Sequence, residues 1–211
     1  MTKSETWWRW LDKFRKFTYF WLAFWRGIWK FLPDSFNKRW VFFWKNIGYG
    51  LPSSPFLISR MLKYVQWHWV NTIVELWWWT WVMTRAILEK KEDRTILTSC
   101  EIEKDRYEGL KKYENHHTKI VLMDTAACLE TFPEGSIEIV ISTLPLWSMN
   151  PIHAREILQA IHKGLKKDGL YIQYQYFATN KEDIEKLFTI TKSDWEPLNF
   201  PPAFIYICKK N

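Results

Sequence analysis

Cysteine is scarce in this chain, and its cysteines follow no pattern of a scaffold or a metal site. Cys100, Cys128 and Cys208 stand at spacings that match neither a disulfide framework nor a metal-ligand motif. We therefore expect no disulfide scaffold and no zinc module, and a reducing compartment fits this composition best. The histidines show no His-x-x-x-His or mixed Cys/His spacing, so we expect no metal site.

Long apolar runs without charge are also missing. A bilayer span needs roughly 18 apolar residues, and Arg26 and Lys30 interrupt the only candidate, so we expect no transmembrane segment. No small-residue cleavage site follows it, and we expect no cleavable signal peptide. The 211 residues are 47% apolar and 25% charged. This composition excludes a disordered or collagenous chain, and the length fits one domain with an appendage.

Glycine is rare and tryptophan abundant, at 7 and 16 residues. Fourteen of the tryptophans lie at or before Trp81. Residues 1–45 carry 10 Lys and Arg against 3 Asp and Glu, a balance of +7 that equals the formal charge of the whole chain. Residues 46–211 are therefore neutral. We predict a basic, aromatic arm over 1–45, a folded domain over 46–211, and an anionic partner for the arm.

The arm has the period of an amphipathic helix. Its apolar residues recur in steps of three and four, with Lys13, Lys16, Arg26 and Lys30 on or near the opposite face. We expect this helix to lie in the plane of an anionic phospholipid membrane surface, with its aromatic face down. The membrane-facing residues are then Trp10, Phe14, Phe17, Trp21, Phe24, Trp25 and Ile28.

Two other arrangements of the arm stay open. The helix can instead pack on its own domain or be buried in a dimer, since either would cover the same apolar face. Interleaved aromatic and basic residues can also stack on single-stranded nucleic acid. A helical period favours a flat surface, so no nucleic-acid partner is expected. The oligomeric state stays undetermined at this stage.

Beyond residue 46, strand and helix patterns alternate. Strands are expected over 71–76, 95–100, 119–123, 136–142, 170–177 and 203–208, and helices over 56–65, 82–91, 102–113, 151–167 and 181–187. Gly169 is expected to stop the helix over 151–167, and the strand after Pro201 and Pro202 could run antiparallel at an edge. The alternation predicts an α/β fold with a doubly wound, mostly parallel sheet. Ligands of such sheets bind past the carboxyl ends of the strands.

Three acidic residues fall at that edge of the predicted sheet. Glu75 is near the end of the first strand, Glu101 follows the second, and Asp124 follows the third. A carboxylate after the second strand can accept hydrogen bonds from ribose hydroxyls, and one after the third can accept from an adenine amino group. Each alone is more typical of a helix cap or a solvated loop residue, because Asp and Glu favour such positions. Together they favour a nucleoside-type ligand.

Several segments of the chain resemble one protein family. They are 48–54 (GYGLPSS), 73–76 (IVEL), 139–146 (IVISTLPL), 165–174 (LKKDGLYIQY) and 199–203 (NFPPA). The chain resembles class I S-adenosylmethionine-dependent methyltransferases, and more narrowly the bacterial phospholipid N-methyltransferases. The resemblance implies a Rossmann-like sheet of seven strands, S-adenosylmethionine as cofactor, and stepwise methylation of the phosphatidylethanolamine amine. It also implies a cytoplasmic protein that is peripheral at the inner membrane face.

The same resemblance assigns roles to residues. Cofactor-binding residues would be Glu75 and the loop after it at the methionine portion, Glu101 with Ile102 at the ribose, Asp124 with Thr125 near adenine, and Ser142. The place where the methyl group meets its acceptor would be lined by Ser142, Thr143, Leu144, Pro145 and Leu146.

One loop departs from the family pattern. The family's Glu-Leu-Gly-x-Gly-x-Gly reads Glu-Leu-Trp-Trp-Trp-Thr-Trp here, so Trp77, Trp79 and Trp81, with Thr80 between the last two, replace a glycine loop. Glycine lets the backbone approach a ligand closely, and indole does not. We expect a blocked or reshaped cofactor pocket if the backbone keeps its course. The alternative function is therefore a catalytically inactive, altered or designed protein of the same fold, acting as a membrane-binding or structural scaffold.

Five further residues have two interpretations each. Ser53 and Ser54 could donate to a headgroup phosphate or cap the helix that begins near residue 55. His153 could accept a proton from the amine or be a surface residue of a first helical turn. Tyr174 and Tyr176 could face a developing quaternary ammonium group or belong to the core.

Overall fold

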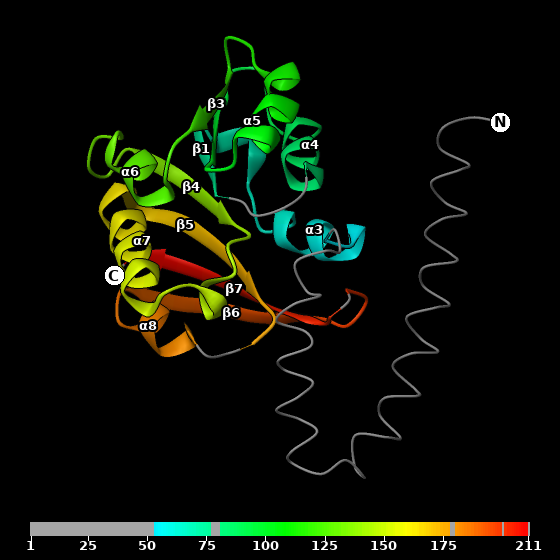
Figure 1. Cartoon of the computed structure of the whole chain (residues 1–211). Coiled ribbons are helices and arrows are strands. Elements are labelled where there is room, and N and C mark those ends of the chain that lie inside the picture. Colours follow the sequence, from blue (N-terminus) through cyan, green and yellow to red (C-terminus); the bar gives the residue numbers. More distant parts are fainter. Residues whose placement is uncertain (1–52, 77–80, 178–179, 200, 211) are drawn as a thin grey trace, which may run out of the picture.

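The computed structural model describes residues 53–76, 81–177, 180–199 and 201–210 (Figure 1). The predicted arm, with all its proposed membrane-facing residues, lies outside these ranges, as do Trp77, Trp79 and Thr80. In the described part of the chain, no helix is long and apolar enough to cross a membrane.

The described residues form one seven-stranded sheet. Its strands are β1 (Thr72–Leu76), β2 (Ile96–Glu101), β3 (Thr118–Leu122), β4 (Ile137–Ser142), β5 (Leu165–Gln175), β6 (Phe188–Glu196) and β7 (Ala203–Lys210). The strand order is β3-β2-β1-β4-β5-β7-β6, with β1 to β5 parallel and β7 antiparallel to both of its neighbours. The predicted doubly wound, mostly parallel α/β sheet is confirmed.

Helices cover both faces of the sheet (Figure 1). One face carries α3 (Pro55–Leu62), α4 (Val82–Leu88) and α5 (Lys104–Leu110), and the other carries α6 (Thr125–Glu130), α7 (Pro151–Gly164) and α8 (Lys181–Glu185). Short 3-10 turns are η2 (Trp67–Trp69), η3 (Lys111–Tyr113) and η4 (Leu146–Ser148). Because both faces are covered, the central strands are apolar on both sides, and an apolar cluster lies between each face and its helices.

The helix starts follow from capping chemistry. Ser54 Oγ accepts a hydrogen bond from the Leu57 amide at the start of α3, which confirms the capping interpretation of Ser54. Asn150 caps α7 in the same way and is followed by Pro151, whose fixed φ suits the first helical position. These caps orient the two helices that flank the carboxyl edge of the sheet.

The connection between α7 and β5 differs from the prediction. The helix ends at Gly164, and β5 begins at once, with a register shift against β4 that leaves 166–169 as a bulge. Asp168 has a φ of 64°, and a Cβ on Gly169 would lie 2.8 Å from the Lys166 carbonyl oxygen. Gly169 therefore allows a close backbone approach inside a bulge and does not stop the helix.

Other predictions about elements were wrong as well. The final strand, β7, runs antiparallel as expected, but it lies inside the sheet between β5 and β6, and β6 forms the edge. Neither β6 nor α6 was predicted. The remaining predicted strands and helices of the body are confirmed, with shifts of a few residues at their ends.

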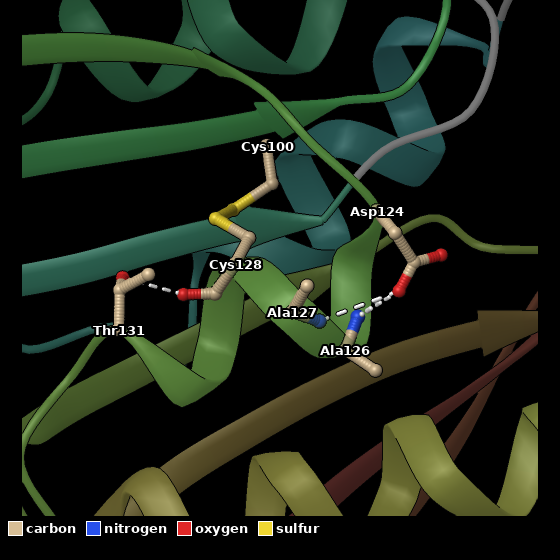
Figure 2. The surroundings of a disulfide bond; sticks show 6 residues. All are labelled: Cys100, Asp124, Ala126, Ala127, Cys128 and Thr131. Atoms are coloured by element: carbon tan, nitrogen blue, oxygen red, sulfur yellow. Dashed lines mark hydrogen bonds between the residues drawn. A yellow bond between two sulfur atoms is a disulfide. The ribbon is translucent and has the colours of Figure 1, made fainter.

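The structure also contains a disulfide that the spacing of the cysteines did not indicate. Cys100 of β2 and Cys128 of α6 form a disulfide, with their Cα atoms 6.4 Å apart (Figure 2). The two residues are 28 positions apart, and the fold brings the end of β2 against α6. Sequence spacing cannot show such a contact. The argument for a reducing compartment therefore loses its premise, because disulfides persist mainly in oxidising environments.

Candidate functional site

Three acidic residues lie along the carboxyl edge of the parallel sheet, as their positions in the sequence predicted. The strands β3, β2 and β1 are neighbours, so Glu75 in β1, Glu101 at the end of β2 and Asp124 just after β3 reach one edge. The Met123 amide donates to the Glu101 carbonyl at 2.9 Å and joins the two strand ends. Ligands of doubly wound sheets bind at this edge.

Glu75 is fully buried on the face covered by α4. The Thr84 hydroxyl donates to Glu75 Oε1 at 3.1 Å, and Ser99 stands opposite in β2. Burial raises the pKa of Glu75 to about 7, although the Thr84 and Ser99 hydroxyls hold it lower than burial alone would. The carboxyl group therefore ties β1 to α4.

The two carboxylate oxygens of Glu101 have different partners. Its Oε1 accepts from the Ile102 and Glu103 amides at 2.8 and 2.7 Å. Its Oε2 is buried, has no hydrogen bond within the described residues, and lies 3.6 Å from Arg106 Nε. Burial raises the pKa of Glu101, partly offset by the Glu103 amide, the Arg106 cation and the Ile102 amide. Arg106 of α5 therefore lies against this carboxylate.

Asp124 is held from two sides. Its Oδ1 accepts from the Ala126 and Ala127 amides and caps α6, the helix that Thr125 opens (Figure 2). Its Oδ2 lies 3.2 Å from His153 Nε2, and His153 Nδ1 lies 3.2 Å from Glu156 Oε2. His153 therefore links the first turn of α7 to the cap of α6. His153 is half-buried, and its role as a proton acceptor stays a prediction.

The loop after β4 is anchored by glutamines of β5. The Leu144 carbonyl accepts from Gln173 Nε2 at 3.0 Å and from Gln175 Nε2 at 3.3 Å. The Thr143 amide donates to the Leu76 carbonyl at 2.8 Å, and Ser142 Oγ accepts from the Leu144 amide. The loop is thus fixed beside the end of β1, where the family resemblance puts the acceptor.

Most of this loop is buried. Leu144 and Leu146 belong to the apolar cluster under α7, and Ser142 and Thr143 are also buried, whereas Pro145 is half-buried. Trp147, just beyond, stacks edge-on against Phe177 with ring centroids 5.0 Å apart. A role of these residues in lining the acceptor stays a prediction.

The two candidate tyrosines lie on the opposite face, beside α3. Tyr174 and Tyr176 make an edge-on pair with centroids 5.4 Å apart and pack against the cluster under α3 and α4. Burial raises the pKa of both, with Ser53 near Tyr174 and Asn199 near Tyr176. Asn199 also accepts from the Ser54 amide at 2.8 Å. This packing agrees with the core interpretation of the pair.

Trp81 is the one described tryptophan of the replaced glycine loop. It precedes α4, is half-exposed, and its ring lies against α5: a Cβ on Gly109 would be 2.6 Å from the ring. The Lys112 ammonium sits 4.4 Å from the same indole, a cation–π arrangement. Trp81 thus packs on a neighbouring helix.

Exposed apolar side chains mark the same edge of the sheet. Ile102 follows β2 and Met123 follows β3, and both keep more than a third of their surface exposed. Ile152, in the first turn of α7, is also exposed. Such side chains suit a flat apolar group such as a nucleobase. In the described ranges, no three His, Cys, Asp or Glu side chains cluster as metal ligands would.

Sequence reasoning missed Arg106, Gln173, Gln175 and the cysteine pair. The glutamines carried a signal, since two amides at alternate positions in an apolar strand need buried partners. No signal in the sequence marks Arg106, because its carboxylate partner lies on another element.

No protein-family model matches the chain, and no curated protein sequence matches it significantly. Solved structures do match. A 1,6-didemethyltoxoflavin N1-methyltransferase of Burkholderia thailandensis, with S-adenosylhomocysteine bound, aligns over 73% of this chain and 76% of its own, at 13% identity and a TM-score of 0.60. The N-methyltransferase NodS of Bradyrhizobium japonicum aligns over 74% and 88%, at 11% identity and a TM-score of 0.57.

Another matching structure shows that the fold does not fix the reaction. A spermidine synthase of Thermotoga maritima aligns over 67% of this chain and 54% of its own, at 16% identity and a TM-score of 0.51. At such identities the comparisons establish architecture. The chain has the Rossmann-like fold of class I S-adenosylmethionine-dependent methyltransferases.

Proposed function

We propose that this protein binds S-adenosylmethionine and methylates the amine of phosphatidylethanolamine at a membrane surface. The observation that carries the proposal is the row of Glu75, Glu101 and Asp124 along the carboxyl edge of a sheet with methyltransferase architecture. The phospholipid acceptor is supported by the sequence resemblance and by the basic, aromatic composition of residues 1–45.

The residues at this edge fit an adenosine group. Glu101 Oε2 is a buried acceptor with no hydrogen bond in the described residues, which suits a ribose hydroxyl donor. Ile102 and Met123 provide exposed apolar surface for the base, and Asp124 stands beside them as an acceptor for its amino group. When bound, S-adenosylmethionine would supply an electrophilic methyl group.

The chain's own contribution to transfer would be positioning. The β4–α7 loop, fixed through the Leu144 carbonyl by Gln173 and Gln175, would orient the acceptor amine next to the end of β1. Its buried apolar side chains would keep water out. Such a displacement needs a neutral amine and little acid–base help, which agrees with His153 being engaged by Asp124 and Glu156.

Calorimetric titration with S-adenosylhomocysteine tests cofactor binding. We expect micromolar affinity, and a loss of about tenfold or more in Glu101→Gln, because a buried acceptor to ribose hydroxyls is replaced in part by a donor. Glu108→Gln on the exposed face of α5 is the matched control and should bind normally. Equal affinities of both variants and the parent would refute the assigned role of Glu101.

Vesicle flotation and a methyl-transfer assay test the acceptor. The full chain should float with anionic vesicles that contain phosphatidylethanolamine and transfer labelled methyl groups to that lipid. A variant lacking residues 1–32 should bind such vesicles more weakly. If it floats as well as the full chain, the proposed membrane role of the arm is wrong.

A second candidate function rests on the tryptophan loop. Trp77, Trp79 and Trp81 stand where the family has glycine, and Trp81 is seen packed on α5. A protein whose indoles fill the cofactor pocket would be a scaffold without catalysis. The titration separates the two functions: a folded protein that gives no heat with S-adenosylhomocysteine favours the scaffold.

A further inference from the structure

The disulfide joins the two elements that carry the nucleoside-side carboxylates. Cys100 immediately precedes Glu101 at the end of β2, and Cys128 lies one turn after Asp124 on α6 (Figure 2). Successive side chains of a strand point to opposite faces. Cys100 therefore faces α6, while Glu101 faces α5 and Arg106.

The short helix α6, capped by Asp124, packs on α7, contacts His153 through its cap residue, and is joined covalently to β2 by the disulfide. With six residues, α6 is far shorter than a helix that is stable by itself. The Cys128 amide donates to the Asp124 carbonyl at 2.8 Å, so Cys128 is coupled to the cap residue by the first helical hydrogen bond. Any movement of Cys128 away from β2 would therefore carry Asp124 with it.

We propose that the Cys100–Cys128 disulfide is a positioning element for nucleoside binding: it sets the spacing of Glu101 and Asp124, so affinity for an adenosine-containing ligand depends on its oxidation state. This inference rests on the proposed function, because it takes those two carboxylates as the nucleoside contacts. The inference adds that the affinity of this site for a nucleoside depends on the redox state of the disulfide.

The reaction involved is exchange with a dithiol reductant. A dithiol delivers two electrons and two protons: the Sγ–Sγ bond breaks, each cysteine sulfur takes a proton, and the dithiol closes to its own disulfide. Both cysteines are about 1% exposed, so attack requires α6 to move away from β2. A nucleoside that bridges Glu101 and Asp124 opposes this movement.

Binding and reduction are then coupled in both directions. If oxidation strengthens nucleoside binding by some factor, the bound nucleoside must favour the disulfide over the dithiol by the same factor. The third cysteine does not interfere, since Cys208 is buried in β7, where burial and the charge of Glu185 raise the pKa of its thiol to about 12.

The test is titration of the full chain with S-adenosylhomocysteine, oxidised and after reduction with dithiothreitol. We expect about tenfold weaker binding by the reduced protein, and a similar loss in Cys100→Ser/Cys128→Ser. Cys208→Ser is the matched control and should bind like the parent in both states. Circular dichroism establishes that each sample is folded.

A second measurement needs no variant. The unmutated protein is exposed to dithiothreitol with and without S-adenosylhomocysteine, and the free thiols are alkylated and counted by mass spectrometry. Bound ligand should slow the appearance of alkylated Cys100 and Cys128 several-fold. A disulfide with only a structural role would raise the free energy of unfolding. Bound S-adenosylhomocysteine would then not slow its reduction, even at ligand concentrations that saturate both the oxidised and the reduced protein.

The outcomes separate the inference from the function on which it rests. Equal affinity in both redox states, with no ligand protection, overturns the redox inference and leaves the proposed function standing. No binding in either state overturns both. Weaker binding by the reduced, folded protein together with ligand protection supports both.

Discussion

At the scale of single residues, the buried carboxyl of Glu75 contributes to the dependence of stability on pH. Its pKa is raised to about 7 by burial, against about 4.3 for an exposed Glu. Between these values the unfolded chain has lost the proton that the folded chain still holds, so raising the pH favours unfolding. This contribution is fully present below pH 4.3 and is lost by about pH 7.

We predict that Glu75→Gln removes this pH dependence. The parent should lose on the order of 3 kcal/mol of unfolding free energy between pH 4.5 and 7.5 that the amide variant does not lose. Urea denaturation of both proteins at several pH values gives the difference. Parallel stability curves would show that Glu75 ionises normally in the folded protein.

The β4–α7 loop is anchored by buried hydrogen bonds of Gln173. Gln173 accepts from the Tyr171 hydroxyl at 2.8 Å and donates to the Leu144 carbonyl, all buried. Gln173→Leu should cost roughly 1–3 kcal/mol, because the buried Tyr171 hydroxyl loses Gln173 as acceptor and keeps only Ser142 nearby. Adding Tyr171→Phe should recover part of that loss. A double variant less stable than the single one would contradict this account.

At the scale of elements, α3 is tied to the sheet edge by charge. Arg60 of α3 contacts Glu196 at 2.6 Å and Asp194 at 3.2 Å, and Lys63 and Tyr64 also donate to Asp194. Burial alone would raise the pKa of Asp194, but hydrogen bonds from Tyr64, Lys63, the next amide and Arg60 hold it well below its usual range. These contacts fasten β6, which has only one neighbouring strand.

We predict that Arg60→Ala destabilises the protein by about 2 kcal/mol, since Glu196 is almost fully buried and would lose its cation. This loss is smaller than the loss expected for a fully buried ion pair, because Arg60 is partly exposed. Lys63→Ala, from the exposed side of the cluster, should cost less than about 1 kcal/mol. Urea denaturation ranks the two, and equal losses would contradict a special role of Glu196.

The elements that sequence patterns predicted are those with a strong local signal. The runs that became β1, β2 and β4 are apolar and β-branched because helices cover both faces. The edge strand β6 has mostly exposed or half-exposed residues and no such run. The six residues of α6 are too few to show a helical period. Gly169 was misjudged because a bulge and a helix end use the same residue type.

At the scale of the whole molecule, the residues of the candidate site also fall into two groups, those that sequence patterns predict and those that they do not. The strand-end positions of Glu75, Glu101 and Asp124 follow from the strand pattern alone, so they could be predicted. The contact of Arg106 with Glu101 and the Cys100–Cys128 bond could not, since each joins two elements whose packing exists only in the fold. A single sequence contains no signal of such pairs.

Charge is divided unevenly between the two parts of the molecule. Residues 1–45 carry the whole net charge of +7, while the rest of the chain is neutral. Basic residues near an anionic membrane each contribute up to about 1 kcal/mol, so four of them together contribute up to about 4 kcal/mol to membrane binding. Binding to anionic vesicles should therefore depend on the lysines and arginines of the arm and weaken as salt is raised.

We predict that replacing Lys13, Lys16, Arg26 and Lys30 by Gln lowers the partition coefficient onto anionic vesicles by at least about tenfold. Replacing four lysines of the body, Lys104, Lys111, Lys112 and Lys119, changes the net charge equally and is the matched control. Vesicle co-sedimentation at two salt concentrations measures both. If the two sets reduce binding equally, net charge and not the arm governs attachment. A loss confined to the arm variant, absent at high salt, would assign the membrane contact to residues 1–45.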